Sequence, residues 1–241
     1  MCADGAADRL PPPAVEVPVG RVEDFPVGAV VWDMGGILYV TPFEVAAELE
    51  AANGLAPGTL PRGPFADGDD RDYAEVDAGA LPEPEYWRRS RQNLLTAGID
   101  VDVQRDIRWE GRERTEVFRA LHAIAGSRYR QGLLTNDASA FLGPDWRSRW
   151  PWSHLFDAMV DSVDIGVRKP HPDAYRAAAD ALRVAVEECL FVDDLTVNVD
   201  AARAAGMAAL RFDVMDPAGS VAAILRSIGL GPSGRSLHAL R

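Results

Sequence analysis

The chain has 241 residues, of which 47% are hydrophobic and 26% are charged, as is typical of a globular protein with one sizeable core. No apolar run approaches the ~18–20 residues of a membrane-spanning helix. A formal net charge of -12 and a pI near 4.8 argue against a nucleic-acid partner, because a phosphate backbone requires clustered cations. We therefore expect a globular protein that binds neither membrane nor nucleic acid.

Residues 1–24 are rich in Pro, Ala, Gly and acidic residues and have no apolar periodicity, which predicts a disordered or loosely attached arm. Acidic residues and the run Pro11–Pro13 stand where a secretory signal would show basic residues followed by an apolar stretch. We therefore expect a cytoplasmic location. The only cysteines, Cys2 and Cys189, do not suggest a disulfide framework.

Five short apolar runs follow along the chain, and each ends in polar residues. They are 29–32, 132–134, 158–160, 190–192 and 208–210. Helical stretches lie between them, notably 172–182 and 196–205, with Gly206 in the place of a C-terminal cap. Strands that alternate with helices predict an α/β fold with a Rossmann-like parallel sheet covered on both faces. Such sheets bind ligands beyond the carboxyl ends of their strands.

The segment between the first two apolar runs has a different character. Three stretches have helix-like spacing and one is loop-like: 43–52, 83–97 and 103–124, then 53–72. We therefore expect an inserted α-helical cap over 42–117, and a core domain made of 25–41 and 118–241. Tyr86 and Trp87 are candidates to begin a helix that faces the site.

Four segments put reactive groups at the ends of predicted strands. They read Val-Val-Trp-Asp-Met-Gly-Gly-Ile-Leu at 30–38, Gly-Leu-Leu-Thr-Asn at 132–136, Val-Arg-Lys-Pro-His-Pro-Asp-Ala-Tyr at 167–175, and Leu-Phe-Val-Asp-Asp-Leu-Thr-Val-Asn-Val at 190–199. Together these segments resemble the four motifs of the haloacid dehalogenase-like (HAD) hydrolase superfamily, and the resemblance covers about residues 28–212. Each motif alone is weak, but their order and spacing are specific.

The resemblance implies a Mg²⁺-dependent hydrolase whose carboxylate nucleophile forms and then releases an aspartyl-phosphate. Asp33 would be the nucleophile and a metal ligand, and Asp194 the second carboxylate ligand. The backbone carbonyl of Gly35 would be a third ligand. Asp193 and Asn198 would support these groups without touching the metal.

The phosphate would be held by three further residues, again as the resemblance implies. Thr135 and Asn136 would bind the substrate, with Thr135 on the phosphoryl oxygens, and Lys169 would orient nucleophile and phosphate. Lys169 is the only lysine of a chain that otherwise uses arginine. Chance explains that placement poorly, because a compact ammonium fits between two oxyanions and a guanidinium does not fill that role equivalently.

Gly35 departs from the pattern of most phosphatases of the superfamily. They carry at this position an Asp that protonates the leaving alcohol, and such acid catalysis is typically worth ~10²–10⁴-fold. A Gly-Gly first motif resembles the subgroup that includes hexose-1-phosphate phosphatases and relatives of the epoxide hydrolase N-terminal domain. We hypothesise a leaving group of low pKa, such as an anomeric or acyl oxygen.

The leading hypothesis is a phosphatase of a small organic phosphate of sugar type. A second reading is a metal-independent 2-haloacid dehalogenase that uses the same aspartate, which the acid pair Asp193–Asp194 disfavours. A third is a catalytically weak relative that binds a phosphorylated metabolite or a protein partner, and Gly35 keeps this reading open. The sequence leaves the oligomeric state open.

Overall fold

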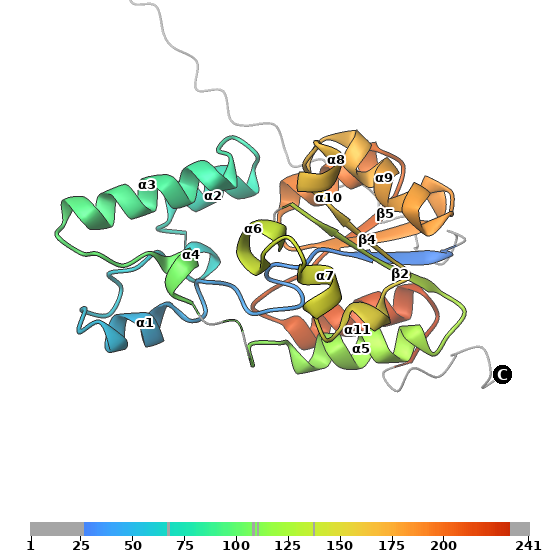
Figure 1. The fold of residues 1–241 in the computed structure, drawn as a ribbon, viewed down its shortest axis with the longest axis horizontal. Coiled ribbons are helices and arrows are strands. Elements are labelled where there is room, and N and C mark those ends of the chain that lie inside the picture. The colour runs from blue at the N-terminus through green and yellow to red at the C-terminus, as the bar shows by residue number, and fades with distance from the viewer. Residues whose placement is uncertain (1–26, 67, 108, 110, 137, 232–241) are drawn as a thin grey trace, which may run out of the picture.

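The computed structural model describes residues 27–231 apart from 67, 108, 110 and 137. The arm predicted at 1–24 lies outside the described residues. Figure 1 shows a central sheet with helices on both sides of it and a group of helices set apart at one end. Of the helices described, none has the length and apolar character to span a membrane.

The sheet consists of five parallel strands in the order β3-β2-β1-β4-β5. They are β1 (Ala29–Trp32), β2 (Arg130–Thr135), β3 (Ala158–Asp161), β4 (Cys189–Asp193) and β5 (Ala208–Arg211). All four residues of β1 are buried, as expected of a central strand covered on both faces. Val31 lies opposite Gly132 of β2 and Phe191 of β4. The five predicted strands and the predicted α/β fold are thus confirmed.

Helices cover the two faces of the sheet (Figure 1). On one face α9 (Pro172–Leu182) and α10 (Thr196–Ala204) pack against the sheet, and on the other α5 (Thr115–Ala125) and α11 (Pro217–Ser227) do so. The predicted helix at 172–182 is confirmed, and the one at 196–205 ends one residue early. Shorter elements complete this part: α6 (Ala138–Leu142), α7 (Trp146–Arg149), η3 (Ser153–Leu155), α8 (Ser162–Ile165) and η4 (Val186–Glu188).

The helices set apart from the sheet are called the helical unit below. They are α1 (Ala46–Ala52), η2 (Gly63–Phe65), α2 (Arg71–Asp77), α3 (Glu83–Thr96) and α4 (Val103–Asp106). This unit has its own buried apolar cluster, which includes Phe43, Leu60, Tyr86 and Trp87. The helical spacing at 43–52 and 83–97 is therefore confirmed, in α1 and α3.

One prediction for this region is wrong, and another holds for most of its length. The stretch 103–124 is not one helix, because α4 ends at Asp106 and α5 begins only at Thr115. Between them Gly111 has a φ of 77°, and Glu113 forms an antiparallel bridge with Tyr39, which carries the chain back to the sheet. The described residues of 53–72 are mostly loop, as predicted, and the exceptions are η2 and the first two residues of α2.

Candidate active site

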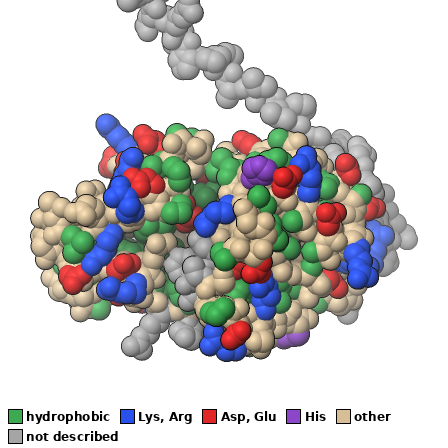
Figure 2. All heavy atoms as spheres, turned by 45° about the horizontal axis from the view of Figure 1, so that its top comes forward, with side chains coloured by type: hydrophobic (Ala, Val, Ile, Leu, Met, Phe, Trp, Pro, Cys, Tyr) green, Lys and Arg blue, Asp and Glu red, His purple; other side chains and the backbone are tan. Residues whose placement is uncertain are grey.

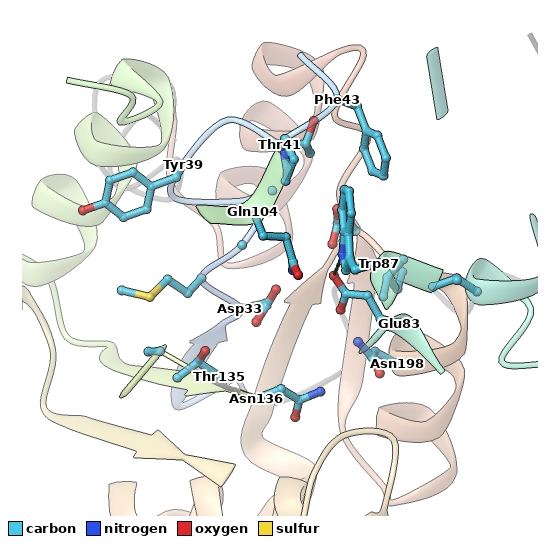
Figure 3. Close-up of a pocket in the computed structure, with 18 of the residues that line it drawn as sticks. Asp33, Tyr39, Thr41, Phe43, Glu83, Trp87, Gln104, Thr135, Asn136 and Asn198 are labelled. Atoms are coloured by element: carbon cyan, nitrogen blue, oxygen red, sulfur yellow. Dashed lines mark hydrogen bonds between the residues drawn. The ribbon is translucent and has the colours of Figure 1, made fainter. Parts of the chain in front are cut away.

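A pocket lies between the carboxyl ends of the central strands and the helical unit, and residues of both line it (Figure 3). The space-filling view shows a recess between these two parts of the molecule, with hydrophobic side chains along it (Figure 2). From the strand ends come Asp33, Gly35, Gly36, Thr135, Asn136, Lys169, Asp194 and Asn198. The topology thus gathers residues from four separate segments at one edge of the sheet.

Lys169 pairs with two carboxylates. Its Nζ donates to Asp33 Oδ1 at 2.6 Å and to Asp193 Oδ2 at 2.7 Å, and its side chain is only 2% exposed. Burial alone would lower the pKa of Lys169, but the charges of Asp193 and Asp33 outweigh burial and raise it. Lys169 is therefore a permanent cation between the two acids.

Three carboxylates converge beside this ammonium. Asp33, Asp193 and Asp194 each have a ligand oxygen within 4.8 Å of the others. Burial raises the pKa of Asp33 to about 7, against the opposing effect of Lys169, and burial with the charges of Asp193 and Asp33 raises the pKa of Asp194. Such crowding is relieved by a cation. A sparse set of carboxylate oxygens fits a hard divalent ion such as Mg²⁺.

Asp193 is fully enclosed and saturated with donors. Besides Lys169, its carboxylate accepts from the N–H of Leu195 at 3.0 Å and from Asn198 Nδ2 at 3.0 and 3.1 Å. These bonds leave Asp194 as the acid of the pair that lines the pocket. The predicted supporting residues Asp193 and Asn198 thus lie together behind Lys169.

Asn136 fastens the loop that carries Lys169. Its Oδ1 accepts from the N–H of Lys169 at 2.9 Å and from Ser162 Oγ at 3.0 Å, and its Nδ2 donates to the Lys169 carbonyl at 3.2 Å. Its neighbour Thr135, the last residue of β2, also lines the pocket. The sequence suggested that Asn136 contacts the substrate. Its hydrogen bonds favour a different role, which is to position Lys169.

The two glycines after Asp33 differ in what surrounds them. Gly36 has a φ of 69°, and a Cβ there would collide with the carboxylate of Asp194. At Gly35 a Cβ would meet nothing within 4 Å. Gly36 is therefore needed for the close approach of this loop to Asp194, whereas a side chain at Gly35 has room.

A partly buried ion pair that the sequence analysis missed anchors the same loop. Arg114, with a side chain only 4% exposed, donates from Nε to the Gly36 carbonyl at 2.9 Å and pairs with Glu44 at 2.6 Å. Glu44 in turn accepts from the N–H of Thr41 at 2.6 Å. Arg114 follows Gly36 by 78 positions, so no local pattern could reveal this contact.

The helical unit supplies the opposite wall of the pocket. The rings of Phe43 and Trp87 stack with centroids 5.2 Å apart, and Trp87 Nε1 donates to Glu83 Oε1 at 3.2 Å. Figure 3 shows Glu83 and Gln104 directed toward the space above Asp33. Helix α3 thus faces the site from its first turn, as predicted for Tyr86 and Trp87.

Comparison with known proteins identifies clear relatives. The family model described as haloacid dehalogenase-like hydrolase matches residues 27–206. "Phosphatase MT3486" of Mycobacterium tuberculosis is 29% identical over 190 residues, which are 78% of this chain and 88% of that protein. Phosphoglycolate phosphatase of Escherichia coli (strain K12) is 32% identical over 75 residues, only 31% of this chain and 29% of that enzyme.

Solved structures share the fold. The L-2-haloacid dehalogenase of Xanthobacter autotrophicus, with chloropropionic acid covalently bound, superposes with a TM-score of 0.51 and 22% identity over 77% of each chain. A structure described as a dehalogenase with intermediate complex gives a TM-score of 0.56 at 15% identity, over 78% of this chain and 86% of the other. At these identities the likeness concerns the fold alone.

Proposed function

The chain belongs to the haloacid dehalogenase-like hydrolases, and on that premise we propose that it is a Mg²⁺-dependent phosphatase of a small organic phosphate with Asp33 as the nucleophile. One observation carries the proposal. Lys169 holds Asp33 at the floor of a pocket, with Asp194 alongside and room for a substrate between strand ends and helical unit. The phosphatase name of the relative that aligns over most of its length agrees with it.

We propose that the carboxylates of Asp33 and Asp194, with the backbone carbonyl of Gly35, hold Mg²⁺. The convergence of three carboxylates within 4.8 Å and the raised pKa values of Asp33 and Asp194 support this assignment. When bound, the ion would neutralise charge on the phosphoryl oxygens and on the attacking carboxylate. Asp193 stays outside the ligand set because its oxygens are already bonded.

The reaction then divides among residues of the chain. An oxygen of Asp33 attacks phosphorus, the bond to the leaving oxygen breaks, and an aspartyl-phosphate forms, which water hydrolyses to phosphate and free Asp33. Lys169 orients Asp33 and opposes the rise in its pKa that burial causes, because their 2.6 Å contact is charge-assisted. Thr135 lines the pocket, and its hydroxyl would donate to the phosphoryl oxygens.

The leaving oxygen must depart without help from residue 35. Gly35 carries no acid, so a leaving group of low pKa is favoured over a simple alcohol. We therefore propose a sugar-type phosphate, with an anomeric or acyl oxygen as leaving group, in line with the resemblance of the Gly-Gly motif to hexose-1-phosphate phosphatases. Aromatic rings on the opposite wall suit the apolar face of a sugar ring.

We propose that the helical unit is a substrate-covering cap. The sequence placed it at 42–117, with the core at 25–41 and 118–241. A boundary just before Thr115 agrees better with the packing. Helix α5 begins there, and its residue Val117 belongs to the apolar cluster on the sheet face that α5 and α11 cover. The predicted cytoplasmic location stays a prediction.

Phosphate release from a panel of sugar, acyl, nucleotide and alkyl phosphates, with Mg²⁺ and with chelator, tests the function. Selective turnover that needs Mg²⁺ and is lost in Asp33→Asn is expected, while Asp180→Asn, an exposed acid on α9, serves as the matched control. Halide release in chelator would instead establish the dehalogenase. Tight binding of a phosphorylated compound without turnover would establish the binding role that Gly35 keeps open.

A further inference from the structure

The helical unit makes a specific polar contact with the loop that carries Asp194. Asp77, the last residue of α2, accepts through Oδ1 from the N–H of Thr196 at 2.8 Å and through Oδ2 from the Thr196 hydroxyl at 3.0 Å. The two residues are 119 positions apart. The side chain of Asp77 is 26% exposed, so the contact is partly shielded from water.

This contact completes the beginning of α10. Thr196 is the first residue of α10, and Leu195, in the N-cap position, provides no side-chain acceptor. Other helices take a carboxylate from their own N-cap residue, namely Asp70, Asp102, Asp161 and Asp216. An N-terminal turn needs an acceptor for its free N–H groups, and it favours negative charge. Asp77 therefore supplies to α10, from another part of the fold, the cap that the local sequence lacks.

Two further residues, Arg211 and Gly79, contact the same region. Arg211 donates from Nε to the Asp194 carbonyl at 3.1 Å and has Nη2 3.6 Å from Asp77 Oδ1. Gly79, with a φ of 74°, lies so close to Val197 that a Cβ would lie 3.2 Å from Val197 Cβ, with a still closer contact to a Val197 methyl. Asp194 before Thr196 and Val197 after it thus have contacts of their own, and the turn after α2 rests directly on α10.

The segment held in this way carries two residues of the site. Asp194 immediately precedes Leu195 and Thr196, and the first turn of α10 carries Asn198, which binds Asp193 behind Lys169. A shift of Thr196 would therefore move Asp194 on one side and Asn198 on the other.

We propose that Asp77 is a positioning residue that acts from the helical unit on Asp194. It sets the affinity for Mg²⁺ by ordering the segment 194–196, and it makes a competent metal site depend on the helical unit resting against α10. This inference rests on the proposed metal-dependent function. Asp77 itself touches neither substrate nor metal.

The test variant is Asp77→Ala, and Asp77→Asn is the conservative variant because it keeps one acceptor for the Thr196 N–H. The control is Asp216→Ala, which removes a carboxylate cap from α11, a helix that does not line the pocket. Mg²⁺ affinity is measured by calorimetry, and hydrogen exchange of residues 196–199 is measured in metal-free protein. Asp77→Ala is expected to weaken Mg²⁺ binding and to speed exchange by roughly 2- to 30-fold, the range for loss of a capping side chain. Asp77→Asn restores part of both, and saturating Mg²⁺ restores kcat.

Three outcomes would overturn the proposal. The first is that Asp77→Ala behaves like Asp216→Ala in both measurements. The second is that Asp77→Ala speeds hydrogen exchange but leaves Mg²⁺ affinity unchanged, which would make Asp77 merely structural. Loss of kcat that saturating Mg²⁺ does not recover would also contradict it. A wild-type protein that binds no Mg²⁺ would refute the metal-dependent function itself, and this result is distinct because it needs no variant.

Discussion

Lys169 Nζ lies 2.6 Å from Asp33 Oδ1, and the same nitrogen lies 2.7 Å from Asp193 Oδ2. One buried ammonium therefore balances the proposed nucleophile and the acid behind it. Removing a partner from a buried charge pair leaves an uncompensated charge, which is more costly than the pair itself.

Lys169→Met is expected to lower the free energy of unfolding by about 3–5 kcal/mol and to abolish turnover, because two buried carboxylates lose their cation. Lys169→Arg should also be inactive, since a planar guanidinium does not fit where a point charge bridges two oxygens. Urea unfolding and phosphate release measure the two effects. A stable, active Lys169→Met would remove Lys169 from the mechanism.

Gly35→Asp is expected to gain activity on alkyl phosphates, because the position has room and the chain lacks an acid there. A general acid is worth ~10²–10⁴-fold, so even partial placement should raise kcat by roughly tenfold or more. Gly35→Asn is the control of equal size without the acid. If both variants turn over alkyl phosphates equally, the missing carboxyl is not what limits the leaving group.

Gly36→Ala is expected to weaken Mg²⁺ binding, since its Cβ would push against the Asp194 carboxylate. The positive φ adds a backbone penalty of about 1–2 kcal/mol. Gly166→Ala isolates that penalty, because Gly166 has a φ of 72° with nothing within 4 Å of its Cβ position. Equal Mg²⁺ affinity in the two variants would contradict the role of the Gly36 contact.

The stability of the metal-free protein should fall as pH rises from about 4 to 7. Burial raises the pKa of Asp33 from 3.8 to about 7, so in this range the native state holds a proton that the unfolded state has released. Bound Mg²⁺ competes with that proton, and the Mg²⁺-induced rise in Tm should therefore grow with pH across the same window. Thermal melts of wild type and Asp33→Asn measure this. An identical pH dependence in both proteins would argue against a raised pKa at Asp33.

The sequence was sufficient to predict the sheet and the residues at its edge. Apolar runs ending in Asp33, Thr135 and Asp193 identify strands, and the carboxyl ends of parallel strands meet at one edge. Contacts between distant segments could not be predicted from the sequence, because they have no local sequence pattern. Examples are the hydrogen bonds of Arg114 with Gly36 and of Asp77 with Thr196. The prediction of a single helix over 103–124 was wrong, because apolar spacing alone does not reveal the turn at Gly111 between two helices.

The central claim is that Asp33 becomes phosphorylated, and trapping the intermediate tests it most directly. Acid quench during turnover of the best substrate, followed by borohydride reduction, converts an aspartyl-phosphate to homoserine, which peptide mapping locates. Homoserine at position 33 is expected in wild type with Mg²⁺, and not with chelator or in Asp33→Asn. Rapid phosphate release with residue 33 unmodified, or with the label on another residue, would contradict the account.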